Sequence, residues 1–424
     1  MKLLTSILLT SLFFFSGPVL AQFTIDAELR PRFEYRHGYK TLFPDNVDPA
    51  SFVSQRTRLK VGYKMEKLNF YLSIQDVRVW GDVVQLNTSD KNGLSVHKAW
   101  GEVLFDPRFT LKLGRQEIVY DDHRIFGNVG WAQQARSHDV ALIKYHKNAL
   151  KINVGVAYNQ DTESLTGNIL TVNTYKSFQY VWLHNDWQEF SASLLVLNNG
   201  LQFIDSEDED VDETRYSQTI GSHLVYQKKK LSFFGNVYYQ FGKDRADNDL
   251  SAYLLGIEGR YKLSQKLSIG SGGELQSGND NGMPSNGKNK AFTPLYGTNH
   301  KFNGLIDYFY VGNHIDNVGL LDLFAKVNLT INSKHNVNLA AHNFSASAVI
   351  NGTNNKQLGT EIDITYNYSY SKDVNFKAGY SHIFPSEGLE IVKNNFDENT
   401  NNWGWVMVTI SPTLFQSEST KTQL

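Results

Sequence analysis

A strict alternation of apolar and charged side chains dominates the N-terminal part of the sequence. From Phe23 to Arg36 the odd positions are apolar or aromatic, and every even position after Thr24 is Asp, Glu or Arg. Residues 56–66 repeat the pattern with Arg56, Arg58 and Lys60 on one face. Successive side chains of a β-strand point to opposite faces, so this period of two predicts strands between an apolar environment and water. A soluble sheet usually carries a mixed polar face, so a continuous charged row favours the wall of an aqueous lumen.

Similar segments recur up to the C-terminus. We predict about eighteen strands, with sixteen as the fallback, at 23–36, 56–66, 68–80, 95–105, 109–117, 135–145, 151–159, 177–185, 190–198, 214–227, 231–241, 252–262, 266–277, 319–331, 336–344, 357–369, 374–382 and 401–412. A length of about ten residues matches a tilted strand that crosses the hydrocarbon layer.

The segments between these strands alternate between short turns and long loops along the whole chain. Outer-membrane β-barrels are built in this way, with short periplasmic turns and long extracellular loops. The composition agrees, because 22 Tyr and 26 Phe can form interfacial girdles, and nine prolines leave central strands intact. The fold class predicted is therefore all-β, a transmembrane antiparallel barrel. A soluble carbohydrate-binding β-protein is the alternative from another class, and its extraction without detergent would favour it.

The N-terminus predicts export. Lys2 precedes an apolar run from Leu3 to Phe15, and small residues before Gln22 offer a cleavage site. This layout is typical of a secretory signal peptide, and the run is short for a transmembrane helix. We therefore expect a cleaved leader at 1–21, a barrel at 22–415 in the bacterial outer membrane, and a polar C-terminal tail at 416–424.

The strongest functional signal is a basic lumen. The predicted inward positions of the first three strands hold several cations, and Asp26, Glu28 and Glu34 offset them in part. These cations are Arg30, Arg32, Arg56, Arg58, Lys60 and Arg78, together with Arg36 and Lys64. An excess of Arg and Lys would concentrate anions in a pore. The charges could also pair with one another and hold the barrel round, and the two interpretations are compatible.

A set of motifs in the first third of the chain resembles a known family. These are Gly114-Arg115-Gln116, Asp122-His123-Arg124-Ile125-Phe126, Trp131, and Arg136-Ser137-His138-Asp139, with a second echo in Tyr296–His300 and Gly304–Phe309. The chain resembles the alginate export family of outer-membrane porins. The resemblance implies an eighteen-stranded barrel with a basic constriction that passes an acidic polysaccharide or its fragments outward. Arg115, Arg124 and Arg136 are the matching arginines, and Asp139 closes the last motif.

The function expected from these observations is a channel for polar, anionic solutes such as acidic oligo- or polysaccharides. The expected partners are outer-membrane lipid, lipopolysaccharide and the saccharide, with a periplasmic export partner left open and no nucleic acid. The sequence has no His-Glu-x-x-His, Gly-x-Ser-x-Gly or Walker motif and no cysteine, so we expect no catalytic site, metal or cofactor. A barrel that acts as an outer-membrane enzyme or an adhesin is the remaining alternative.

Two connections have their own interpretation. The acidic run at 205–213 is expected to be a solvated surface loop, although it could bind cations that bridge lipopolysaccharide. The long segment 278–318 is expected to fold into the pore and narrow it, with its aromatic part from Phe302 to Tyr310 packed inside.

Overall fold

The computed structural model describes residues 21–204, 212–315 and 317–417. The leader expected at 1–21, apart from its last residue, lies outside these ranges. So do residues 205–211 of the acidic run and residues 418–424 of the expected tail.

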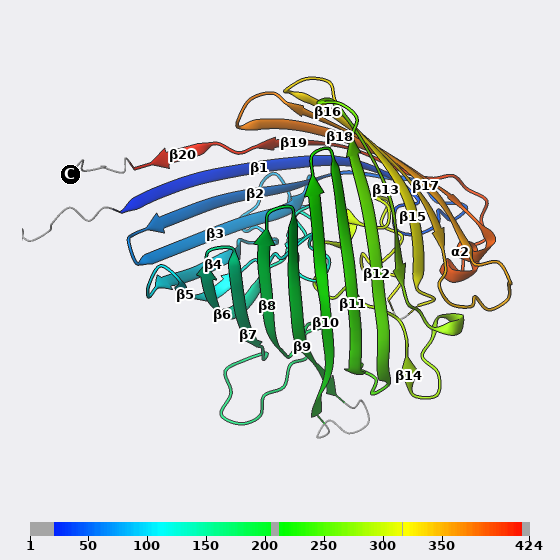
Figure 1. Cartoon of the computed structure of the whole chain (residues 1–424). Coiled ribbons are helices and arrows are strands. Elements are labelled where there is room, and N and C mark those ends of the chain that lie inside the picture. The colour runs from blue at the N-terminus through cyan, green and yellow to red at the C-terminus, as the bar shows by residue number, and fades with distance from the viewer. Residues whose placement is uncertain (1–20, 205–211, 316, 418–424) are drawn as a thin grey trace, which may run out of the picture.

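The fold is a closed antiparallel barrel of 18 strands (Figure 1). Its strands are β1 (Gln22–His37), β2 (Ala50–Lys64), β3 (Leu68–Val79), β4 (Ser95–Leu104), β5 (Phe109–Gln116), β6 (His138–Lys147), β7 (Leu150–Tyr158), β8 (Ser177–Trp187), β9 (Phe190–Ile204), β10 (Asp212–Lys228), β11 (Leu231–Lys243), β12 (Asp249–Lys262), β13 (Leu267–Gln276), β15 (Leu320–Thr330), β16 (His335–Ser345), β17 (Gln357–Ser369), β18 (Val374–Pro385) and β19 (Asn401–Ile410). Each pairs with its neighbours along the chain, and β1 closes the ring against both β2 and β19.

Five short elements complete the described fold. The strand β14 (Lys288–Asn289) pairs parallel to β12, and the helix α2 (Glu387–Lys393) lies between β18 and β19. Two single-turn 3-10 helices, η2 (Asp280–Gly282) and η3 (Asn299–Lys301), lie between β13 and β15. After a break at Ser411 and Pro412, β20 (Thr413–Gln416) pairs with the start of β1, with Phe415 opposite Ile25. Pairing with β1 therefore continues beyond the strand predicted to end at residue 412.

All eighteen predicted strands are present, and the boundaries differ in a few places. The second strand begins at Ala50 instead of residue 56, and β9 continues to Ile204 instead of residue 198. Both extensions are paired with a neighbouring strand, Ala50 with Arg36 and Ile204 with Asp212. Hydrogen bonding can continue beyond the apolar part of a strand, and for this reason periodicity alone underestimates its length.

The outward face of the barrel is apolar. Its aliphatic side chains include Leu59, Ile143, Val154, Ile220 and Leu323, all exposed outside the sheet. Exposed aromatic residues lie near both ends of the strands, with Phe70, Phe109, Trp187, Phe190, Phe233 and Tyr261 toward the short turns and Phe33, Tyr35, Tyr216, Tyr239, Phe241 and Phe384 toward the long loops. An apolar band between two aromatic girdles is the outer surface of a membrane barrel. Across the described ranges, no helix is both long and apolar enough to cross a membrane.

Two of the long loops fold into the barrel and form its core (Figure 1). The loop between β5 and β6, residues 117–137, buries Ile125 and Phe126 against the inner wall. The loop between β13 and β15, residues 277–319, buries Ile306, Tyr308 and Phe309. We name these the first and second inward loops. The second was expected to enter the pore, and the structure confirms it, whereas the first was predicted only as a long connection.

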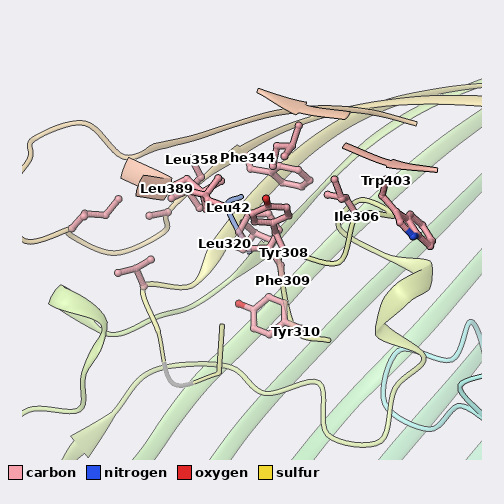
Figure 2. Packing of buried hydrophobic residues seen from close by; sticks show 14 of the residues in the cluster. Leu42, Ile306, Tyr308, Phe309, Tyr310, Leu320, Phe344, Leu358, Leu389 and Trp403 are labelled. Atoms are coloured by element: carbon pink, nitrogen blue, oxygen red, sulfur yellow. The ribbon is translucent and has the colours of Figure 1, made fainter. Parts of the chain in front are cut away.

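The second inward loop packs against the wall formed by β15 to β19. Tyr308 and Phe309 lie among Leu42, Leu320 and Phe344, and Leu389 of α2 belongs to the same cluster (Figure 2). The Tyr308 hydroxyl donates a hydrogen bond to the carbonyl oxygens of Gly38 and Thr41, each at 2.8 Å. The loop between β1 and β2 is thereby held against the second inward loop at the long-loop end of the barrel.

Candidate solute pathway

Four arginines form a row on the inner wall of β1 and β2. Arg30, Arg32, Arg56 and Arg58 are 5–7% exposed, and Arg30 lies directly opposite Arg56 in the strand pairing. Four guanidinium groups this close repel one another, so a row of them requires acceptors that face it. The alternating pattern of the first strands predicted this row correctly, because the period of two places all four side chains on one face.

The acceptors are backbone carbonyl groups of the first inward loop. Arg30 Nη1 donates to the Gly130 oxygen at 2.7 Å, and Arg32 Nη1 donates to the Trp131 oxygen at 2.8 Å. Arg56 Nη1 donates to the Gln133 oxygen at 3.2 Å, and Arg58 Nη2 to the Gln134 oxygen at 3.4 Å. Hydrogen bonds from charged donors are stronger than those between neutral groups. The arginine row therefore anchors this loop inside the barrel.

Buried carboxylates of β13, β15 and β17 hold the second inward loop. Asn303 donates to Glu274 at 3.0 Å and to Asp322 at 3.2 Å, and the Ile306 amide donates to Glu361 Oε1 at 2.9 Å. These three carboxylates are at most 7% exposed. The arginines of β1 and β2 therefore hold one loop through their donor groups, and the carboxylates of β13, β15 and β17 hold the other loop through their acceptor oxygens.

Several contacts join the inward loops to each other. Arg124 of the first loop forms an ion pair with Glu274 and donates to Asn303 Oδ1 at 3.1 Å. Trp131 stacks on His300 of the second loop with ring centroids 4.6 Å apart, and the Arg32 guanidinium lies 4.1 Å above the Trp131 ring. Arg136 also reaches the second loop and donates to the Gly297 oxygen at 3.0 Å. The two loops thus form one body across the lumen.

The structure does not bring every predicted residue to this body. Arg115 pairs with Asp139 across β5 and β6 on the face opposite the buried Gln116 and His138. Arg78 pairs with Asp76 and Asp90, and strand alternation places it on the face of β3 opposite Gln75. Lys60 lies on the inner wall, where it pairs with Glu28 at 2.9 Å. The family resemblance alone named Arg115 and Asp139. Arg78 lies on the other face of its strand from Gln75, and at the end of β3 it still lines the loop-side cavity described below.

Two cavities lie on either side of the inward loops. The one toward the long-loop end has a volume of about 500 Å³ and is lined in part by Arg32, Arg36, Lys40, Arg136 and Asp307. Burial lowers the pKa of Lys40, and the negative charge of Asp307 opposes that shift. Lys40 belongs to no strand, and periodicity therefore could not identify it. This cavity brings several cations together at the loop-side mouth.

The other cavity lies deeper, has a volume of about 320 Å³, and is lined in part by Glu258, Arg260, Lys301, Lys326 and His342. The Lys301 ammonium donates to the Asp122 carbonyl oxygen at 2.9 Å. Burial lowers the pKa of Lys301, and the negative charge of Asp122 opposes that shift. Arg260 and Lys326 stood at inward positions of predicted strands, so alternation could have identified both.

Gly304 of the second inward loop lies against the carboxylate of Glu361. Its φ is +83°, and a Cβ atom there would lie 2.3 Å from Glu361 Oε2. We expect Gly304→Ala to displace the loop and to increase hydrogen exchange at the Ile306 amide more than tenfold. Gly312→Ala is the matched control, because Gly312 has a φ of +79° and open space around its Cβ position. Both variants should lower the free energy of unfolding by about 1–2 kcal/mol, because each places a side chain on a left-handed backbone conformation. Equal exchange in the two variants would contradict the steric role of Gly304.

Comparisons with known proteins agree with this architecture. The barrel is similar to the crystal structures of OpdQ from Pseudomonas aeruginosa (TM-score 0.60, 12% identity, covering 93% of this chain and 98% of that one) and of OccAB4 from Acinetobacter baumannii (0.63, 11%, 93% and 98%). It is also similar to the outer membrane protein OpdK from Pseudomonas aeruginosa (0.60, 10%, 93% and 98%). No curated protein matches the sequence.

The sequence itself identifies the family. Residues 21–402 match the profile described as alginate export, which covers nearly the whole barrel. The family and the structural neighbours are channels rather than enzymes, and their barrels belong to the bacterial outer membrane. This chain is an outer-membrane porin that belongs to the alginate export family.

Proposed function

We propose that the barrel passes anionic saccharides, such as acidic oligo- or polysaccharides, along the basic inner wall and past the two inward loops. One observation carries the proposal: in most interior ion pairs the cation is more exposed than its carboxylate. Exposure is 33% for Arg36 against 1% for Glu34, and 53% for Arg260 against 13% for Glu258.

The remaining interior pairs follow the same trend with few exceptions. Lys144 is 33% exposed against 13% for Glu102, and Lys326 is more exposed than Glu258. The exceptions are Arg124 with Glu274 and Arg56 with Glu28, whose arginines hold the first inward loop in place, and Lys98 with Glu117, which are equally exposed. A solute in the lumen therefore meets mainly positive groups, although acids are numerous in the interior. Positive groups in a confined channel raise the local concentration of anions and repel cations.

The test is the reversal potential of the refolded porin in planar bilayers with a potassium chloride gradient. We expect permeability to chloride to exceed that to potassium severalfold, and conductance to be blocked by an oligouronate. The variant Arg36→Gln/Lys40→Gln/Arg136→Gln removes three cations at the loop-side cavity and should reduce the chloride preference at least by half. Arg115→Gln is the control, because its side chain lies off the inner wall.

Three outcomes have distinct meanings. An unchanged reversal potential in the triple variant would contradict the role of the loop-side cations. Anion-selective openings that no oligouronate blocks would support an anion channel and would contradict the saccharide as its solute. A folded, detergent-dependent barrel without openings would favour the enzyme or adhesin alternative.

A further inference from the structure

The short-turn end of the lumen holds a cavity in which the cations have no acidic partner. Its volume is about 780 Å³, and its lining contains Lys230, Lys262 and Lys266 without any carboxylate. In the described part of the chain, many interior cations form ion pairs, among them Arg36, Lys60 and Lys326, whereas none of these three lysines does. Uncompensated cations in a concave site attract an anion more strongly than paired ones.

These lysines are accompanied by neutral polar groups in the cavity lining. The lining also includes Ser264, Gln265, Ser268, Asn328 and Thr330. In the strand register Lys262 lies opposite Ser268, and Ser268 lies opposite Asn328. Ile257 and Tyr261 of β12 point to the opposite, outward face. Hydroxyl and amide groups next to ammonium groups suit a ligand with hydroxyls and a negative charge, and Lys262, Ser268 and Asn328 lie on the face of the sheet that is turned away from the lipid.

The cavity and the deeper one are lined by neighbouring inward positions of two strands. On β12, Lys262 of the mouth cavity lies two residues from the inward Arg260 of the deeper cavity, and on β15 Asn328 lies two residues from Lys326. Neighbouring inward positions on one strand lie about 6.6 Å apart. A chain-like anion bound at the mouth therefore has further cations within reach toward the inward loops.

The charges at the two ends of the barrel differ. In the short turns Lys and Arg outnumber Asp and Glu, whereas acids outnumber bases in the long connections. Short turns of outer-membrane barrels face the periplasm. The end that faces the periplasm is thus the attractive end for a polyanion.

We propose that the cavity of Lys230, Lys262 and Lys266 is a loading site that binds the carboxylate groups of an acidic saccharide at the periplasmic mouth. The site gives the channel an entrance on that side, and this inference rests on the anion channel proposed above. Occupancy precedes passage toward the inward loops along Arg260 and Lys326.

The experiment compares block from the two sides of oriented channels with a uronic acid hexamer as the probe. The chain has no cysteine, so Ser89→Cys in the β3–β4 loop, biotinylated and bound by streptavidin, reports which side carries the loops. In the parent protein we expect block from the short-turn side at a concentration about tenfold lower than from the loop side. Lys230→Gln/Lys262→Gln/Lys266→Gln should abolish this difference while chloride selectivity remains.

The control variant Lys67→Gln/Lys334→Gln/Lys372→Gln removes the same charge from other short turns and should keep the sidedness. An equal loss of sidedness in both triple variants would overturn the proposed loading site, since the general positive charge of the rim would then explain the block. Equal block from both sides of the parent would overturn it too, with anion selectivity intact. A parent that lacks anion selectivity altogether would instead refute the proposed channel function.

Discussion

Replacing Val129–Ala135 by Gly-Gly should raise the single-channel conductance several-fold. The Arg136 amide donates to the Asn128 carbonyl oxygen at 2.7 Å, so the two ends of this segment already lie side by side, as in a two-residue hairpin. The deletion removes Trp131 and the carbonyl groups that the arginine row binds. The strands themselves remain, and the lumen gains the volume that the loop occupied.

The same deletion should increase the preference for chloride. Arg30, Arg32, Arg56 and Arg58 would face water instead of carbonyl oxygens, and only Glu28 and Glu34 would remain to compensate them. Planar-bilayer recordings of conductance and reversal potential measure both effects. The control replaces Thr162–Asn168 of the exposed β7–β8 loop by Gly-Gly, where the Asp161 amide and Ile169 oxygen are 3.3 Å apart. A deletion with unchanged conductance would show that the first inward loop does not limit the pathway.

Arg124→Met should release the second inward loop. Arg124 is 1% exposed and is the ion-pair partner of Glu274, which is itself 7% exposed. Removal of one partner leaves a buried charge without compensation, which costs about 3–5 kcal/mol. A local loss of about 3 kcal/mol corresponds to hydrogen exchange about a hundredfold faster in residues 303–309. Hydrogen–deuterium exchange with mass spectrometry of the refolded porin checks this value.

Two further variants separate the buried charge from a general loss of contact. Arg124→Met/Glu274→Gln should recover much of the protection, since both charges are removed together. Arg260→Met removes an arginine that is 53% exposed and paired with Glu258, so its cost should stay below about 1 kcal/mol. Exchange in Arg124→Met that equals exchange in Arg260→Met would refute the joining role of Arg124.

The sequence alone determined the barrel. The period of two and the alternation of short and long connections predicted all eighteen strands, because a membrane strand must show lipid one face and water the other. The same alternation placed Arg30, Arg32, Arg56 and Arg58 on the inner wall. Periodicity contains this information since it depends only on the direction of consecutive side chains.

Only the tertiary structure decided what those arginines contact. Their acceptors are backbone carbonyl groups 76 to 100 residues away, and no residue type marks a carbonyl that will face a guanidinium. The carboxylates that hold the second inward loop come from strands more than twenty residues from one another, so their convergence depends on the closed ring. The unpaired lysines at the short-turn mouth likewise result from register and curvature. Side-chain direction follows from local sequence, whereas partnership across a lumen follows from closure of the whole barrel.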